Sequence, residues 1–157
     1  MNMINKSIDS ILFSLNQQMS TWIKDSEISL FNKSLSVTPY KISDAFYYVL
    51  QQGKLINDKT DGAFDYTIYP IADLWGFGPN SDNDKTNPEN TELDKVLTYV
   101  GTDKIKLEYP YIKKLHPKIK LDLNAIAKGY AVDQIHNWFC LLYASPSPRD
   151  GLLSRMP

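Results

Sequence analysis

Residues 121–130 decide the fold, and they read Leu121-Asp122-Leu123-Asn124-Ala125-Ile126-Ala127-Lys128-Gly129-Tyr130. Leucine alternates with a polar residue at the start of this stretch, which is typical of a strand with one buried face. The small residues that follow begin a helical pattern, and Asn124 is a suitable N-cap for it. We therefore expect a strand that delivers the Asp122 carboxylate to the first turn of a helix.

The first turn of this helix has a face with almost no side chain. Ala125 and Gly129 are four residues apart and share that face, and Lys128 lies beside it. Helix N-termini bind anions, and small residues let a ligand or a metal reach the backbone. The pattern fits an anion site, and it equally fits a tight contact between helix and sheet in which Asp122 only assists capping.

Helical spacing of apolar residues predicts four further helices, and three of them have a capping or stop residue. They are Ile4–Met19, a short helix after the cap Ser26, a helix from the cap Ser43 to the stop Gly53, and Thr91–Val100 before Gly101. Alternation predicts two strands, 104–108 and 118–123, which pair through the turn between them. Residues 34–40 and 80–90 are expected to be loops, and residues 60–79 are expected to be irregular because they are rich in turn formers.

The composition is that of an ordinary globular protein with one domain. Of the 157 residues, 43% are hydrophobic and 22% are charged, and the formal net charge of −1 favours neither nucleic acid nor an anionic membrane as a partner. No apolar run is long enough to span a membrane, and the first residues lack the apolar stretch of a signal peptide. Cys140 is the single cysteine, and His116 and His136 lack the spacing of a zinc site.

A second segment with chemical character reads Asp61-Gly62-Ala63-Phe64-Asp65. Gly62 permits backbone angles that other residues avoid, so the loop can hold a ligand against backbone amides. An ordinary turn with Asx hydrogen bonds has the same pattern. A third segment lies between Met19 and Asn32. There Trp22 can stack on a flat heterocycle and Asn32 can bind an amide edge, or Trp22 is a buried indole at a helix end.

Three groups of residues therefore stand in a fixed order along the chain. They are Met19-Ser20-Thr21 with Ser26-Glu27-Ile28-Ser29-x-Phe31-Asn32, Thr60-Asp61-Gly62-Ala63-Phe64-Asp65 with Leu74-Trp75-Gly76-Phe77-Gly78, and Asp122-Leu123-x-Ala125-Ile126-Ala127-Lys128-Gly129-Tyr130-Ala131-Val132-Asp133. In this order they resemble the ApbE family of flavin transferases (FAD:protein FMN transferases), over about residues 4–139. The resemblance implies an α+β fold, the N-terminal portion of the family's domain, with helices packed on a mixed or antiparallel sheet.

The resemblance implies an enzyme that cleaves FAD and attaches its FMN half, through a phosphoester bond, to a threonine or serine hydroxyl of an acceptor flavoprotein. AMP leaves, and Mg²⁺ is required. Cleavage of a pyrophosphate is mostly a matter of positioning and charge neutralisation, which suits a basic residue at a helix start. Two alternatives stay open: a member of the family that hydrolyses FAD to FMN and AMP, and a module that binds FAD without turnover.

The resemblance also implies roles for individual residues, although it identifies no catalytic residue. Seven residues are implied to contact FAD: Trp22, Asn32, Ala63, Phe64, Asp65, Asp122 and Lys128. Among them, residues 63–65 match a flavin nucleotide-binding stretch, and Trp22 matches an aromatic contact. Ala125 matches a magnesium position, for which alanine offers only its backbone carbonyl.

Several features of the family are not found in this chain. Its members usually begin with a lipoprotein signal and a strand whose methionine contacts FAD, and they continue with a histidine-bearing segment and an Asp/Thr group that completes the magnesium site. We therefore expect residues 1–139 to be a partial flavin transferase domain and residues 140–157 to be a disordered or foreign tail, and we expect little or no activity from the chain alone. Family members are typically lipoproteins of the bacterial periplasm, and the compartment of this chain stays open.

Overall fold

The computed structural model describes residues 3–79 and 88–143. Its elements in chain order are α1 (Met3–Met19), α2 (Glu27–Lys33), β1 (Tyr40–Lys41), α3 (Asp44–Lys59), α4 (Tyr69–Leu74), α5 (Asn90–Leu97), the short 3-10 helix η1 (Thr102–Lys104), β2 (Ile105–Glu108), β3 (Tyr111–Lys114) and α6 (Asn124–Tyr143). Most of the loop expected at 80–90 and most of the tail expected at 140–157 lie outside the described residues.

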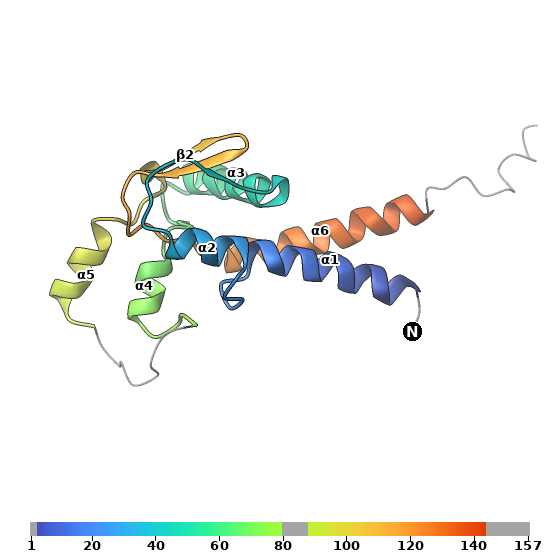
Figure 1. Cartoon of the computed structure of the whole chain (residues 1–157), viewed down its shortest axis with the longest axis horizontal. Coiled ribbons are helices and arrows are strands. Elements are labelled where there is room, and N and C mark those ends of the chain that lie inside the picture. Colours follow the sequence, from blue (N-terminus) through green and yellow to red (C-terminus); the bar gives the residue numbers. More distant parts are fainter. Residues whose placement is uncertain (1–2, 80–87, 144–157) are drawn as a thin grey trace, which may run out of the picture.

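Helices form most of the molecule, and a small sheet lies beside α3 (Figure 1). α1 and α6 pack side by side and extend together away from the sheet, whereas α4 and α5 lie at the opposite end. Helices with a three-stranded antiparallel sheet confirm the expected α+β class. Within residues 3–79 and 88–143, no helix combines the length and the apolar character needed to cross a membrane.

The sheet has the strand order β1-β3-β2. β2 pairs with β3 and not with residues 118–123, so the predicted pairing is wrong. In the observed register Ile105 lies opposite Lys114 and Leu107 lies opposite Ile112. Alternation does not reveal β3, because this strand buries Lys114 at a position where an alternating strand has an apolar residue. Only two residues separate β2 from β3, so β3 is closer to β2 along the chain than the expected partner, residues 118–123.

Residues 119–123 form no strand, and every second side chain of the segment is buried. Ile119, Leu121 and Leu123 have no exposed surface, which confirms the predicted alternation between buried and outward-facing side chains. Their core partners come from helices, strands and the 60–66 turn: Met19, Ile28, Phe31, Ile42, Phe46, Val49, Leu50, Tyr66, Ile105 and Ile112. The segment therefore joins the helical layer to the sheet.

The starts of α2 and α3 are linked by one carboxylate. Ser26 caps α2 as expected, because its hydroxyl accepts a hydrogen bond from the Ser29 amide at 3.2 Å. Ser43 holds the N-cap position of α3, but its side chain makes no capping bond there. Its amide and hydroxyl instead donate to the two carboxylate oxygens of Glu27, each at 2.6 Å. Glu27 thus fixes the start of α3 from the first turn of α2.

Three boundaries differ from those expected. α3 continues to Lys59 through Gly53, so Gly53 is not a stop. α4 occupies part of the stretch expected to be irregular, with Pro70 in its first turn, where a proline loses no helical hydrogen bond. α5 ends at Leu97, before the expected end at Val100. The two residues of β1 are also absent from the sequence-based prediction, since so short a strand leaves no pattern.

Gly53 is required by packing. A Cβ atom at this position would lie 2.8 Å from Cδ1 of Tyr66 and 3.2 Å from Cδ1 of Ile126, and both of those residues pack into the core. The glycine therefore lets the Tyr66 ring lie directly against the backbone of α3. At a second helical glycine, Gly129 in α6, an added Cβ atom would have no neighbouring atom within 4 Å.

We expect Gly53→Ala to destabilise the fold by about 1–3 kcal/mol, because overpacking outweighs the gain in helix propensity. Gly129→Ala is the matched control, and it is expected to stabilise α6 by roughly 0.5–1 kcal/mol, since nothing opposes the added methyl group. Urea unfolding followed by far-UV circular dichroism measures both. Equal or higher stability of Gly53→Ala would contradict the packing argument.

Lys114 is a buried cation that ends α2. Its side chain is 1% exposed, and its ammonium donates to the carbonyls of Phe31 at 2.8 Å and Ser34 at 2.7 Å. It also lies 4.5 Å from the centre of the Phe31 ring. Burial lowers the pKa of the Lys114 ammonium to about 8 from its ordinary 10.5, and the charge of Lys120 adds to this effect. A cation among carbonyls stabilises a helix C-terminus, here that of α2.

The lowered pKa of Lys114 predicts the pH dependence of stability. Between pH 8 and pH 10.5 the unfolded chain holds a proton on this lysine that the folded chain has released, so the free energy of unfolding rises with pH in that window. The difference in unfolding free energy between the native chain and Lys114→Met should grow by about 2 kcal/mol from pH 7.5 to pH 10.5. Lys113→Met, on the exposed side of β3, should give no such growth. A flat difference for Lys114→Met would show that its pKa is not lowered.

Candidate functional site

The site is organised by Asn32, which is buried in α2. Its side-chain amide pairs with the backbone of Leu121 in both directions: the Leu121 amide donates to Oδ1 at 2.7 Å, and Nδ2 donates to the Leu121 carbonyl at 2.9 Å. This is the pattern by which a neighbouring strand satisfies an extended segment. Asn32 was expected to line a ligand site, and it does line the cavity described below. Both ends of its amide are bonded to Leu121.

Asp122 joins two of the three sequence segments. Its backbone amide donates to the carbonyl of Tyr66 at 2.8 Å, which brings the 60–66 turn against residues 121–123. Its carboxylate Oδ1 accepts the amide of Asn124 at 2.7 Å, and so it caps the start of α6. The expected N-cap role of Asn124 is wrong, because Asn124 is the first residue of α6. Its side chain points instead toward the hydroxyl of Thr21, at 3.5 Å.

The turn that contains residues 61–65 has left-handed backbone angles at two positions. Asp61 has a φ of 51° and Gly62 has a φ of 82°, which agrees with the conformational freedom expected of Gly62. Ala63 is exposed and Phe64 is partly buried against the core. Asp65 accepts two hydrogen bonds from Thr67 on one oxygen, from the amide at 2.7 Å and from the hydroxyl at 2.6 Å.

Thr67 extends this network to a distant part of the chain. Its side chain is fully buried, and its hydroxyl oxygen accepts the amide of Gly101 at 2.7 Å. The Asp65 carboxylate is therefore held in place by a group that is itself fixed. Its second oxygen, Oδ2, forms no hydrogen bond with the described residues.

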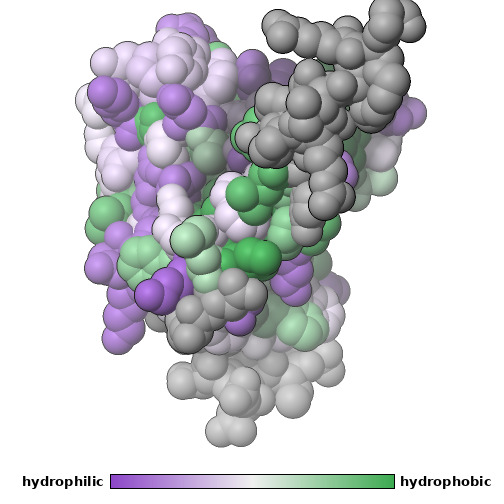
Figure 2. Space-filling view, turned by 90° about the vertical axis from the view of Figure 1, so that its right-hand side faces the viewer, coloured by the Kyte–Doolittle hydropathy of each residue, from purple (hydrophilic) through white to green (hydrophobic). Residues whose placement is uncertain are grey.

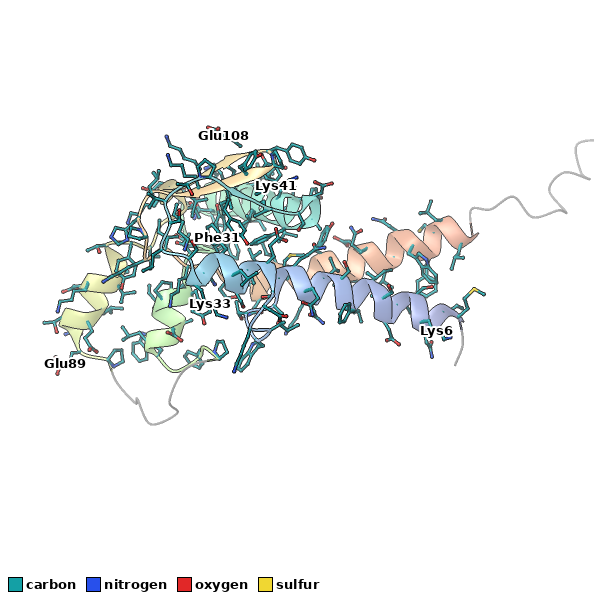
Figure 3. All side chains as sticks on the ribbon, in the orientation of Figure 1. Lys6, Phe31, Lys33, Lys41, Glu89 and Glu108 are labelled. Carbon is teal, nitrogen blue, oxygen red and sulfur yellow. The ribbon has the colours of Figure 1, made fainter. Side chains whose placement is uncertain are left out.

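A cavity of about 430 Å³ opens beside Asn32. It is lined by Thr21, Trp22, Lys24, Ser29, Asn32, Lys33, Leu35, Tyr69, Pro79 and Lys120. The Trp22 side chain is 66% exposed, so the indole is available for stacking and is not a buried helix end. Figure 3 shows Phe31 on the side of α2 that faces the sheet and Lys33 on the opposite side, where the cavity lies.

The cavity has a positive character. Three of its lining residues are lysines and none is acidic. Lys33 donates to the carbonyl of Lys24, whereas the ammonium of Lys24 itself has no ion pair or hydrogen bond with the described residues. The ammonium of Lys120 lies 5.5 Å from the centre of the Tyr69 ring. A cavity with an exposed indole and uncompensated cations suits a ligand that combines a flat ring with negative charge.

Lys128 and Ala125 lie on α6, away from this cavity. Lys128 lines a smaller cavity of about 170 Å³ between α1 and α6, which also includes Ser20 and Asn124. The contact between Asn124 and Thr21 connects the two cavities, because each of these residues lines one of them. Ala125 and Gly129 are both exposed, so the small-residue face expected on α6 is open.

The described residues do not form a magnesium site by themselves. Mg²⁺ requires several oxygen ligands in octahedral arrangement, and Ala125 can offer one backbone carbonyl. In residues 3–79 and 88–143 there is no cluster of three or more His, Cys, Asp or Glu side chains that could hold a metal ion. The donor set that the structure describes therefore does not fit the metal.

Sequence patterns singled out two of the residues that line this cavity but none of its lysines. Trp22 and Asn32 line the cavity of about 430 Å³. Asp65 and Asp122 do not line it, and Asp122 is linked to it only through the backbone of Leu121, which bonds to Asn32. Lys24, Lys33, Lys120 and Tyr69 were not singled out. A signal existed for Lys120, because strand alternation places it on the same side of the segment as Asp122.

Comparison with known proteins gives consistent matches along the chain. Residues 2–140 match the protein-family model described as ApbE family. An FAD:protein FMN transferase from Haemophilus influenzae is 41% identical over 136 residues, which are 83% of this chain and 39% of that protein. Its counterpart from Vibrio cholerae is 36% identical over 135 residues, 86% of this chain and 40% of that protein. The chain spans about 40% of the length of these curated relatives.

Solved structures agree with the sequence matches. The flavin transferase ApbE from Vibrio cholerae has a TM-score of 0.82 at 36% identity, over 86% of this chain and 43% of that one. The apo form of the flavinyl transferase ApbE from Pseudomonas stutzeri has a TM-score of 0.81 at 28% identity, over 85% of this chain and 44% of that one. The helices and the small sheet described above thus match part of these structures.

The pairing of Asn32 with Leu121 predicts a large effect of substitution. Asn32→Ala leaves one buried amide and one buried carbonyl without partners, which should cost about 2–4 kcal/mol of unfolding free energy. Asn137→Ala, at an exposed position of α6, is expected to change stability by less than about 0.5 kcal/mol. Chemical denaturation of the two variants measures the contrast. A loss below 1 kcal/mol for Asn32→Ala would mean that Leu121 does not depend on this side chain.

Proposed function

Because this chain belongs to the ApbE family, we propose that it serves in the transfer of FMN from FAD to a threonine or serine hydroxyl of an acceptor protein. In this reaction the hydroxyl oxygen bonds to the FMN phosphorus, and the bond from that phosphorus to the bridging oxygen breaks. AMP leaves with the bridging oxygen, and the hydroxyl proton is released. The acceptor is a flavoprotein with a suitable threonine or serine.

The observation that carries this proposal is the meeting of three distant segments at Leu121 and Asp122. Asn32 bonds to the first of these residues and Tyr66 bonds to the second, so the segments around Trp22, Asp65 and Asp122 adjoin one another. The cavity next to them has an indole and three lysines. FAD has two flat ring systems joined by a pyrophosphate, which matches this combination of aromatic and cationic groups.

We propose a role in FAD binding for each of the following residues. Trp22 stacks on a ring of FAD at the exposed edge of the cavity. Residues 63–65 bind the flavin nucleotide with the Asp65 carboxylate held in place by Thr67. Asp122 and Lys128 contact FAD from the start of α6. Asn32 acts by positioning, since its amide holds the segment that carries Asp122.

We propose that Mg²⁺ binds to the complete family domain. The Ala125 carbonyl is proposed as one of its ligands, since only the backbone of an alanine can coordinate a metal. The described residues do not provide the remaining protein ligands.

FAD binding tests the site directly. We expect the chain to quench flavin fluorescence on titration, and we expect Trp22→Ala to raise the dissociation constant for FAD about two- to twelvefold, through the loss of about 0.5–1.5 kcal/mol of stacking. Phe13→Ala is the matched control, because Phe13 is an aromatic side chain with the same 66% exposure, on α1. An unchanged affinity in Trp22→Ala would remove Trp22 from the site, and a chain that does not bind FAD would contradict the proposed function.

Product analysis separates the three candidate activities. With FAD, Mg²⁺ and an acceptor peptide, transfer gives AMP together with covalently bound flavin, whereas hydrolysis gives AMP and free FMN. Binding without turnover gives quenching and no AMP. The proposal requires covalent flavin on the peptide once the remaining part of the family domain is supplied, and free FMN alone would favour hydrolysis.

A further inference from the structure

Two lysines lie directly opposite each other on the outer face of the small sheet. Side chains of opposite residues in an antiparallel pair point to the same side, and Lys106 of β2 is opposite Lys113 of β3. Both lysines are exposed, whereas Ile105 and Ile112 of the same strands are buried. The Cβ atoms of such a pair are about 4.5–5.5 Å apart, and like charges at that distance destabilise a sheet. The register therefore places a repulsive pair on the exposed side of the sheet.

A third lysine lies in the neighbouring row of the same face. Lys41 of β1 is opposite Tyr111 of β3, and Tyr111 is opposite Glu108 of β2. All three side chains are exposed, and Figure 3 shows Glu108 on the outer side of the sheet, away from α3. Within residues 3–79 and 88–143, none of the three ammonium groups forms an ion pair or a hydrogen bond. Three positive charges and one negative charge therefore face solvent here without a partner.

A hollow of about 180 Å³ lies over this face. It is lined by Pro39, Lys106, Glu108, Tyr111, Ile112 and Lys113. This volume is below that of the clefts that hold drug-sized ligands, so the hollow suits a group of a few atoms. The upper part of the face in Figure 2, at the level of the sheet and α3 in Figure 1, is mostly hydrophilic or neutral. The surroundings of the hollow in that view are thus polar.

A phosphate group fits this arrangement better than a carboxylate does. A lysine ammonium is a compact point charge with three donors, and lysine is a common phosphate ligand. A phosphomonoester has a charge of about −1.5 to −2 at pH 7 and three acceptor oxygens, so it can compensate two ammonium groups at once. A carboxylate has a single charge and would leave one lysine of the pair uncompensated. The Tyr111 hydroxyl, in the next row, can donate a further hydrogen bond.

We propose that Lys106 and Lys113, with Lys41 and Tyr111 beside them, bind the phosphate group of a small soluble phosphomonoester. This site shares no lining residue with the cavity beside Asn32, so it is separate from the proposed FAD site. Three lysines are fewer than the about four to eight basic residues of a typical lipid-binding cluster. The net charge of −1 also gives no long-range attraction to a polyanion, so the local pair decides the ligand.

The repulsion between the lysines gives a test in which two effects have opposite signs. Without phosphate, Lys106→Gln should raise the melting temperature by up to about 4 °C, because it removes the like-charge pair. In about 20 mM inorganic phosphate the native chain should melt about 3–7 °C higher than in sodium chloride of equal ionic strength, if the dissociation constant is about 1 mM. Lys106→Gln should lose most of that shift. Lys6→Gln, at the far end of α1 in Figure 3, is the matched control and should keep it.

Backbone amide NMR locates the bound anion without FAD, so this result is independent of the proposed function. Inorganic phosphate and glycerol phosphate should shift the signals of residues 106, 111 and 113 saturably, and Lys113→Gln should weaken binding about fivefold or more. A phosphate response that survives Lys106→Gln would overturn the proposal. So would shifts confined to Trp22 and Lys24, because the anion would then bind in the cavity beside Asn32.

Vesicles test whether the ligand is soluble. Phosphatidic acid presents a phosphomonoester on a membrane, and phosphatidylcholine vesicles are the control without one. We expect glycerol phosphate to bind and neither vesicle to sediment the chain. Sedimentation with phosphatidic acid that Lys106→Gln abolishes and Lys6→Gln does not would overturn the assignment of a soluble ligand. Absence of any response to inorganic phosphate and glycerol phosphate would overturn the site itself.

Discussion

One side-chain amide holds the architecture together. Residues 119–123 place Ile119, Leu121 and Leu123 in the core, and no strand among the described residues pairs with this segment. Asn32 takes the place of that strand at Leu121, with one donor and one acceptor in the correct geometry. Because Asn32 belongs to α2, the pairing fixes the helical layer against the segment that leads into α6. The cavity, the Asp122 carboxylate and the start of α6 all take their positions from this contact.

The sequence predicts burial better than it predicts backbone pairing. Alternation identified Ile119, Leu121 and Leu123 as core residues, and each is fully buried. It could not say that Asn32, 89 residues away, would complete their hydrogen bonding. Gly53 illustrates the same limit, since a glycine in a helical pattern reads as a stop unless one knows that the Tyr66 ring packs against it. Local sequence patterns predict whether a residue is buried, whereas its hydrogen-bond and packing partners depend on the tertiary fold.

The candidate site likewise contains residues that the sequence singles out and residues that only the folded structure reveals. The residues with distinctive chemistry and local context, Trp22, Asp65 and Asp122, were identified from short motifs. The lysines around the cavity were not, because a surface lysine has no pattern of its own and gains meaning only from what lies beside it. Lys120 was not singled out either, although the alternation of residues 118–123 places it on the same side as Asp122. The positive character of the cavity is thus a property of the folded chain.

Glu27 couples the starts of two helices, α2 and α3. Its carboxylate binds both the amide and the hydroxyl of Ser43, so the first turn of α2 and the first turn of α3 share a single anchor. Helix ends ordinarily fray one at a time and at small free-energy cost. Here neither end can open without releasing the other, and α2 carries Asn32 while α3 carries the glycine that receives Tyr66. We therefore expect the two helix starts to fray together, since one carboxylate holds both of them.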